Sequence, residues 1–526
     1  LIQTLVQVEA NQTLTLSYQD ATSVPIASKA TSIPLFEEIT EQVNLPFHHK
    51  ESDFDDFDRE FLLPHKLSDF GPALAVADVN GDGLDDFFVG GASGQSGALF
   101  LQSASGSFTQ KRNQPWRQHN ASEAADAIFF DADNDQDMDL LVVNGSNEYA
   151  ASDESLQDHL YLNDGSGNFR WAEQALPPMR SFGTCATAGD FDGDGDQDVF
   201  VGGYVIPGKY PAADRSYLLE NSQGTFRDVT DTWLPDLKQN ELVTDAQWIK
   251  VETSELPALA VVGAWMAPTL FVNDGSSLRP TDHPDSKASG WWFSITTADW
   301  NQDGADDLVL GNIGLNYRYS ASPQSPFELY ADDFDANGST DLLFGYYQNG
   351  KLYSVEERDR MYQQLPAVKK KFTDYDSYAQ AALTEIVGQN VLQEAKHFSA
   401  QTFSSSLASI QGGKVAEIRP LPNEAQLSAV RDIIVADVNQ DGHLDIILAG
   451  NLHNVETRTP RLDAGNGLVM LGNGQGNFDP LPTAESGLYV PGDVRKLAWL
   501  RSSSGHILLV TNNNGPLQLF RLAVTQ

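Results

Sequence analysis

The sequence predicts an all-β fold, a β-propeller of four-stranded blades, and three observations lead to this prediction. A short acidic turn recurs along the chain, and most copies are evenly spaced. Short apolar runs typical of β-strands stand before and after each copy. Gly-rich turns then connect further alternating runs, which supply the outer strands of each unit. At 526 residues with 41% hydrophobic content, the chain can bury the large core that such a fold needs.

The acidic turn marks the start of each repeat. Its first copy, "DVNGDGLDD", lies between the apolar runs "ALAVA" and "FFVGG", so the turn joins two strands. Two further units, near Asp245 and Asp493, keep the strand pattern without the acids and are expected to be metal-free. Most starts lie about 53 to 59 residues apart, which suits one blade per repeat. The six acidic copies begin at Asp78, Asp131, Asp190, Asp299, Asp333 and Asp437.

The number of blades follows from the irregular part of this pattern. The unit at Asp333 begins only 34 residues after the unit at Asp299. Counting inner strands therefore gives eight blades, or seven if these two units share one. Residues 356–396 have helical spacing and many good helix formers, so they are expected to form a helical insertion.

The N-terminal part predicts how the ring closes. The segment "LFEEITEQVNLP" from Leu35 is similar to the outer-strand segment "TFRDVTDTWLP" from Thr225, whereas the last unit ends without such a strand. An N-terminal strand is therefore expected to complete the last blade, which removes two exposed sheet edges.

The aspartates of the turns predict calcium. Positions 1, 3, 5 and 9 carry Asp or Asn, and these carboxylates would repel one another without a cation. Ca²⁺ takes about 6 to 8 oxygen ligands, whereas Mg²⁺ tends to keep its waters. The alternative is solvated acidic turns without metal. We expect about six Ca²⁺ sites, with the ligands Asp78, Asn80, Asp82 and Asp86; Asp131, Asp133, Asp135 and Asp139; Asp190, Asp192, Asp194 and Asp198; Asp299, Asn301, Asp303 and Asp307; Asp333, Asp335, Asn337 and Asp341; and Asp437, Asn439, Asp441 and Asp445.

Long loops predict a partner-binding face opposite the metal turns. The loops between the second and third strands are long, and loops on a rigid scaffold often hold binding sites. Tyr, Trp and Arg dominate binding hot spots, so a positive, aromatic rim suggests an acidic or glycan-like ligand. The alternative is that these residues only pack the loops together. The candidates are Tyr149, Tyr210, Arg215, Tyr317, Arg318, Tyr319, His453, Arg458 and Arg461, with Trp116, Arg117, Trp291 and Trp292 from the blade-to-blade loops.

Other features exclude or weaken several function classes. The net charge of −40 makes nucleic-acid binding improbable. The sequence has no apolar run long enough to span a bilayer and no leader, and we interpret it as a mature or processed piece. Cys185 is expected to be a buried small side chain. His48, His49, Asp53, Asp55 and His65 could suggest a second metal site, but their spacing matches no metal motif, and a structural or solvated role is preferred.

The acidic turns resemble those of the FG-GAP or VCBS-type calcium-binding β-propellers. More narrowly, "LPHKLSDFGPALAVADVNGDGLDD" and "VVGAWMAPTLFVNDG" are similar to bacterial surface proteins related to cartilage acidic protein. Residues 1–21 resemble the end of an ASPIC/UnbV domain, so residues 1–34 are expected to be the tail of that domain and a linker, and residues 35–526 the propeller.

The resemblance implies a setting and leaves two function classes open. It implies an extracellular or cell-surface protein of a Gram-negative bacterium, associated with the outer membrane, within a lipoprotein complex beside SusC/SusD-type nutrient transporters or in adhesion. Its partner would be a protein or a polysaccharide. The sequence shows no familiar catalytic motif, which favours a binding protein. The alternative is a glycan-active enzyme, a polysaccharide lyase or hydrolase built on the propeller.

Overall fold

The structure, a computed structural model, describes residues 34–237, 241–281, 288–503 and 505–523, together with Leu14, Ser17 and Gln19. Within these residues, seven antiparallel four-stranded units form a closed ring, because their inner strands contact one another in sequence from β2 (Leu74–Ala77) round to β30 (Val494–Ser502) and back to β2. The predicted β-propeller is confirmed. The proposed ASPIC/UnbV tail lies almost entirely outside the described residues, so that prediction stays open.

Each of the first four blades is a chain of consecutive hairpins. Blade 1 holds β2 (Leu74–Ala77), β3 (Asp86–Val89), β4 (Ala98–Gln102) and β5 (Phe108–Lys111). Blade 2 holds β6 (Ala124–Phe130), β7 (Asp139–Asn144), β8 (His159–Asn163) and β9 (Phe169–Trp171). Blade 3 holds β10 (Gly183–Gly189), β11 (Asp198–Gly203), β12 (Tyr217–Ser222) and β13 (Thr225–Asp228). Blade 4 holds β14 (Leu242–Ile249), β15 (Ala258–Met266), β16 (Thr269–Asn273) and β17 (Leu278–Pro280).

The last three blades include one interrupted blade and one closed by the N-terminus. Blade 5 holds β18 (Gly290–Ala298), β19 (Asp307–Asn312), β24 (Ser406–Gln411) and β25 (Lys414–Pro420). Blade 6 holds β26 (Asp432–Ala436), β27 (Asp445–Ala449), β28 (Leu468–Gly472) and β29 (Phe478–Leu481). Blade 7 holds β30 (Val494–Ser502), β31 (Gly505–Asn512), β32 (Gln518–Leu522) and β1 (Phe36–Glu38). The predicted closure is confirmed, because Phe36 lies opposite Leu522 in the β1–β32 pair.

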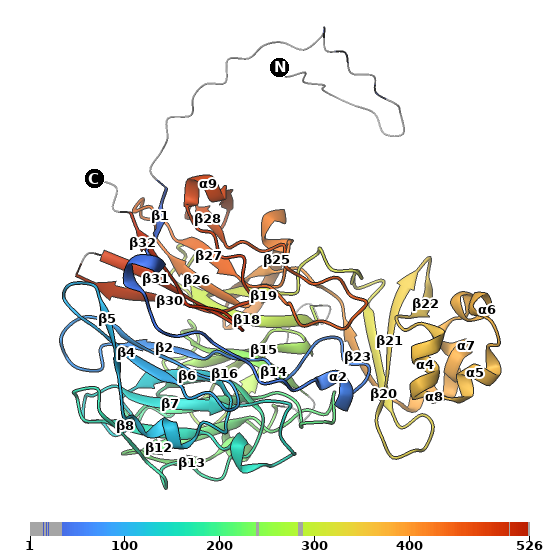
Figure 1. Ribbon diagram of the computed structural model, residues 1–526, viewed down its shortest axis with the longest axis horizontal. Helices are drawn as coiled ribbons and strands as arrows, with labels where there is room; N and C mark the ends of the chain where they lie inside the picture. Colours follow the sequence, from blue (N-terminus) through green and yellow to red (C-terminus); the bar gives the residue numbers. More distant parts are fainter. Residues whose placement is uncertain are drawn as a thin grey trace.

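An eighth four-stranded unit, a separate sheet, lies outside the ring. Between β19 and β24 the chain forms β20 (Phe327–Asp332), β21 (Asp341–Gln348), β22 (Lys351–Ser354) and β23 (Lys396–Ala400). This sheet projects to one side of the ring, with the inserted helices against it (Figure 1). The acidic turn at Asp333 connects β20 to β21 of this sheet and belongs to no blade, so the ring has seven blades, and the unit at Asp333 is inserted within the blade that begins with the unit at Asp299.

The predicted helical insertion is confirmed. It comprises α4 (Arg358–Gln364), α5 (Ala367–Lys371), α6 (Tyr375–Gln380), α7 (Leu383–Val387) and α8 (Gln389–Glu394). Its apolar side chains pack on Leu343 of β21. Short helices elsewhere are α1 (Thr40–Val43), α2 (Asp56–Arg59), α3 (Thr230–Trp233) and α9 (Thr483–Ser486), and short 3₁₀ turns are η2 (Pro115–Gln118), η3 (Glu154–Leu156) and η4 (Asn423–Gln426). None of the helices in the described part of the chain has the length and apolar character to cross a membrane.

The core is divided among the contacts between blades. The inner strand of each blade contacts the inner strands of its two neighbours, and β30 contacts β2 to close the circle. One apolar cluster fills each gap, as where Phe130 of blade 2 packs with Val199 and Leu219 of blade 3. Both faces of a blade are therefore buried, which explains why its middle strands read as nearly continuous apolar runs.

Candidate metal turns and the opposite face

Five of the six acidic turns lie on one face of the ring, because each joins the first and second strands of blades 1, 2, 3, 5 or 6. The sixth occupies the same place in the inserted sheet, between β20 and β21. Blades 4 and 7 have no such turn. The loops between second and third strands emerge at the opposite face, as expected from the antiparallel order.

The aspartate at position 9 attaches each turn to its blade. In blade 3, Oδ2 of Asp198 accepts a hydrogen bond from the N–H of Phe191 (3.1 Å), and Oδ1 accepts one from the N–H of Asn221 (2.8 Å) in the third strand. Asp139 and Asp445 make the corresponding pairs of bonds in blades 2 and 6. These side chains are buried, so position 9 fixes the turn rather than projecting into solvent.

The environment of position 9 disfavours a bare negative charge. Burial, followed by the charges of other aspartates in the same turn, raises the pKa values of Asp86, Asp139, Asp198 and Asp307 to about 7. The hydrogen bonds from backbone N–H groups act in the opposite direction but do not compensate fully. A cation beside these carboxylates would remove the penalty.

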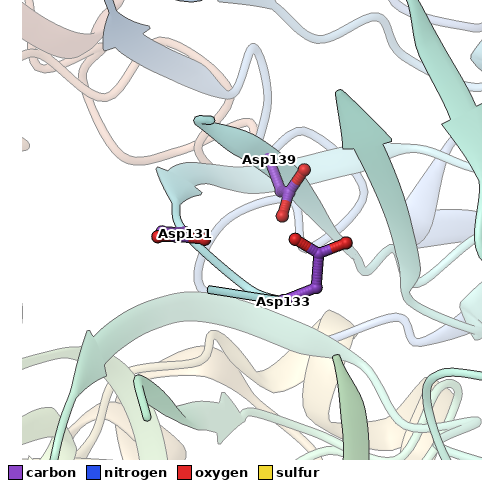
Figure 2. Close-up of side chains that lie close together, drawn as sticks. All are labelled: Asp131, Asp133 and Asp139. Atoms are coloured by element: carbon purple, nitrogen blue, oxygen red, sulfur yellow. The ribbon is translucent and has the colours of Figure 1, made fainter. Parts of the chain in front are cut away.

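Three turns bring three carboxylates together. Figure 2 shows the carboxylates of Asp131, Asp133 and Asp139, whose nearest oxygens lie within 4.8 Å of one another. Oδ1 of Asp131 and Oδ1 of Asp133 are buried and have no hydrogen-bond partner. Free carboxylate oxygens in so small a space fit a hard cation such as Ca²⁺. The same grouping occurs for Asp190, Asp192 and Asp194, and for Asp333, Asp335 and Asp341.

The other three turns differ at position 3, which is asparagine. The amide nitrogen of Asn80 donates to Asp86 (3.2 Å), and that of Asn301 donates to Asp307 (2.7 Å). In the third turn Asn439 donates to Asp441 (2.9 Å). An amide thus replaces one carboxylate, which reduces the negative charge available to a cation in these turns.

The structure also contains a repeated contact that the acidic-turn motif did not predict. In the third strand of one blade, an asparagine amide donates to the position 2 carbonyl in the turn of the preceding blade. The three bonds run from Asn163 to Val79 (2.8 Å), from Asn221 to Ala132 (2.8 Å) and from Asn273 to Phe191 (2.7 Å). The repeated Asn in "YLND", "LLEN" and "FVND" was the available signal. Each such turn is therefore held by two blades.

Four of the predicted partner-binding residues are buried, and their prediction as surface contacts is wrong. Trp291 and Trp292 belong to β18, not to a loop, and are 3% and 0% exposed. Tyr210 is also buried, and its hydroxyl accepts a hydrogen bond from Nε1 of Trp265 (2.7 Å). Trp291 and Tyr210 belong to the apolar cluster beneath the loops, together with Phe327, whereas Trp292 packs between blades 4 and 5. Trp116 is buried as well, between blades 1 and 2.

The expected positive charge of the rim is largely neutralised. Arg215 lies 3.0 Å from Asp228, Arg458 lies 3.0 Å from Glu357, and Arg461 lies 3.4 Å from Asp463. Glu357 belongs to the inserted segment, so its proximity to Arg458 could not be inferred from the local sequence. These pairs remove the main reason to expect an acidic ligand on this face.

The remaining candidates connect neighbouring loops. Nη1 of Arg318 donates to the carbonyl of Arg458 (3.1 Å), which links the loop after β19 to the loop after β27. Tyr317 and Tyr319 extend the buried aromatic cluster toward the surface. The hydroxyl of Tyr149 donates to the carbonyl of Ala121 (2.6 Å), and Nη2 of Arg461 lies 3.1 Å from Nε2 of His453. Packing the loops together is thus a real role for several of them.

The histidine-rich segment before β2 has a structural role. Asp55 accepts a hydrogen bond from the N–H of Phe57 at the start of α2 (3.2 Å), His65 lies 2.8 Å from the carbonyl of Lys66, and His48 lies 2.9 Å from that of His49. His49 and His65 are buried in different surroundings. Among the described residues, this segment contributes to no convergent group of metal-binding side chains.

Comparisons with known proteins agree with the repeat. Residues 78–142 and 144–201 match the FG-GAP-like repeat family. No curated protein matches the chain. Similar solved structures include BBS1N in complex with ARL6DN (11% identity, TM-score 0.40, covering 88% of this chain and 95% of that one), and the V. cholerae biofilm matrix protein Bap1 (11%, 0.38, 88% and 89%). A third is YCF48 bound to D1 peptide (8%, 0.40, 88% and 95%).

The family match begins at the acidic turn of blade 1 and extends through blade 2 to the second strand of blade 3, and it includes the acidic turns at Asp78, Asp131 and Asp190. The same strand–turn–strand arrangement continues around the ring beyond the matched residues. The chain is therefore a seven-bladed β-propeller that contains FG-GAP-like repeats.

Proposed function

We propose that this protein is a calcium-stabilised β-propeller that binds a protein or polysaccharide partner at the face opposite its acidic turns. The calcium site is supported chiefly by the turn of residues 131–139, where buried carboxylate oxygens lie close together without hydrogen-bond partners. Asp131, Asp133, Asp135 and Asp139 would hold the ion there, and the other five turns would act in the same way. The ion would neutralise like charges and pin the turn.

Removal of calcium tests this part. A ligand at about 100 times its Kd stabilises the folded state by about 2.7 kcal/mol per site, so chelation should lower the melting temperature clearly. Asp133→Asn should reduce the calcium-dependent part of the shift, because it removes one of the grouped charges. Glu41→Gln, an exposed position in α1, is the control and should keep the full shift. Identical melting curves with calcium and with EDTA would contradict the proposal.

The proposed setting is outside the cytoplasm. Turn sites of this kind fill where calcium approaches about 0.1 to 1 mM, as outside cells. The resemblance to ASPIC/UnbV-associated proteins supports the surface of a Gram-negative bacterium, in an outer-membrane nutrient-uptake complex of the SusC/SusD type or in adhesion. Cell fractionation tests this setting, and recovery of the protein from the cytosol would contradict it.

The binding part rests on the long loops of the opposite face. Arg117→Ala and Arg461→Ala change exposed side chains on this face and should weaken partner binding, with little effect on the melting temperature. Arg170→Ala, an exposed position on outer strand β9, is the control. Binding to immobilised polysaccharides and to outer-membrane protein fractions is the measurement. The same samples distinguish a binding protein from a glycan-active enzyme, because new reducing ends or unsaturated sugars would show turnover.

A further inference from the structure

A pocket lies where the inserted segment meets the loop after β19. Its volume is about 610 Å³. One wall is the hairpin β21–β22, another is helix α6, and the link from β22 to α4 lies between them. The loop after β19 contributes Arg318 and Tyr319 and closes the remaining side. All of these residues lie between β19 and β24, so the pocket is built entirely by the insertion into blade 5.

A row of tyrosines lines this pocket. Tyr346 and Tyr353 lie opposite each other in the β21–β22 hairpin, with ring centroids 6.2 Å apart, and Tyr319 packs on Tyr346 at 5.1 Å. These three rings are partly exposed, and Tyr375 at the start of α6 is 62% exposed. Tyr378 is buried, and its hydroxyl donates to the carbonyl of Glu356 (2.9 Å). The pocket thus presents aromatic surface with polar edges.

The charged groups around the pocket balance one another. Arg358 lies 3.1 Å from Asp359 and 4.1 Å above the ring of Tyr375. Arg360 lies 3.0 Å from Glu456 and 3.5 Å from Glu356. Four guanidinium groups and four carboxylates lie in or next to the pocket, namely Arg318, Arg358, Arg360 and Arg458 with Glu356, Glu357, Asp359 and Glu456.

We propose that this pocket binds a neutral saccharide, an inference that rests on the proposed binding function and assigns it a ligand class. A sugar ring offers C–H faces that pack on tyrosine rings, and hydroxyl groups that can donate to carboxylates and accept from guanidinium groups. An anionic ligand would meet as many carboxylates as guanidinium groups. A purely apolar ligand would displace the water that hydrogen-bonds to these charged groups and would offer no hydrogen bonds in its place.

The shape of the site favours a saccharide over a protein surface. Ligand pockets typically enclose about 300–1,000 Å³, a range that includes this pocket. A stable protein interface buries about 800 Å² on each partner and is usually much broader than such a pocket. A chain end or a short stretch of a glycan fits a concave site between a hairpin and a helix, and the tyrosines would contact successive sugar units.

Titration calorimetry with the calcium-loaded full chain tests the proposal. The probes are short neutral oligosaccharides, namely glucans, mannans, xylans and galactans, with polygalacturonate and an unrelated tyrosine-rich peptide as competing classes. The wild-type protein should bind at least one neutral oligosaccharide. Tyr353→Ala and Tyr375→Ala should each weaken that binding by about tenfold or more. Tyr489→Ala changes a tyrosine that is 53% exposed and does not line the pocket, so it should bind like the wild type.

Each outcome has a defined meaning. Equal binding by the Tyr353 and Tyr489 variants, with unchanged melting temperatures, would overturn the saccharide site. So would the absence of binding to every neutral oligosaccharide, or binding of polygalacturonate or the peptide alone. In those cases the general binding function still stands if Arg117→Ala or Arg461→Ala weakens capture of a polysaccharide or an outer-membrane protein. If neither pocket nor face variants affect any binding, both proposals fail.

Discussion

At the scale of single residues, Glu51 connects stability to pH. This residue precedes β2 and lies in a buried polar cluster where Nδ2 of Asn513 donates to its carboxyl group (2.5 Å). Burial, followed by the nearby charge of Asp69, raises the pKa of Glu51 to about 8. The folded state therefore binds this proton more tightly than the unfolded chain, where the pKa is about 4.5. The stabilisation is complete below about pH 4.5 and is lost as pH rises through about 8.

Glu51→Gln should remove part of this dependence. Glutamine stays neutral and can still accept from Asn513, so the variant should lose less unfolding free energy than the wild type between about pH 6 and pH 9. The difference can reach about 1.4 kcal/mol for each pH unit over which only the folded state holds the proton. Urea unfolding at the two pH values is the measurement. Glu41→Gln, an exposed position in α1, should follow the wild type, and parallel behaviour of both variants would contradict the assignment.

At the scale of elements, the acidic turn depends on two blades. In blade 3 the amide of Asn221 donates to the carbonyls of Ala132 and Gln197, at 2.8 and 3.0 Å. One bond reaches the turn of blade 2, and the other reaches the end of the turn in its own blade. The asparagine therefore couples the position of one turn to its neighbour without any metal.

Asn221→Ala should destabilise the protein by about 1–3 kcal/mol, because it leaves two buried carbonyl groups without their donor. Denaturant unfolding in the presence of calcium measures this loss. Asn120→Ala alters an exposed asparagine before β6 and should change stability by less than about 0.5 kcal/mol. Equal stability of the two variants would show that water replaces the amide at no cost.

Sequence patterns located the turns and strands better than the surface contacts. The alternation of apolar runs around the acidic turn identified β2, β3 and their equivalents, because that pattern is local. The sequence pattern predicts a loop for Trp291 and Trp292, although aromatic residues favour strands, and the structure places both in β18. The pairing of Arg458 with Glu357 joins residues about 100 positions apart, and no local pattern carries that information.

At the scale of the whole molecule, the ring is also held across its axis. Lys496 of blade 7 lies 3.0 Å from Asp126 of blade 2, and the charges of Asp245 in blade 4 and Asp432 in blade 6 also raise its pKa. Each of these aspartates accepts a hydrogen bond from a backbone N–H of the next blade, at 3.0, 2.9 and 2.6 Å. One half-buried lysine thus offsets carboxylates from three other blades.

The blade count shows where the repeat pattern was ambiguous. An acidic turn between two strands predicts a blade, and residues 333–341 satisfy that pattern completely. In the structure this hairpin belongs to the inserted sheet, whose strand order β22–β21–β20–β23 differs from that of a blade. The short spacing along the chain between Asp299 and Asp333 indicated that they do not begin two separate blades, because 34 residues are too few for four strands of this size and their connections. The spacing of the repeats along the chain therefore predicted the number of blades more reliably than the number of acidic motifs.

Ring closure depends on the smallest strand of blade 7. β1 has three residues, and Phe36 within it is 2% exposed and stacks on Trp499 with ring centroids 6.0 Å apart. Removing residues 1–39 should expose the edge of β32, lower the melting temperature and promote association through that edge. Removing only residues 1–33 keeps β1 and serves as the control. Differential scanning calorimetry and analytical ultracentrifugation measure both effects. A monomer with wild-type stability after loss of β1 would show that blades 1 to 7 close without it.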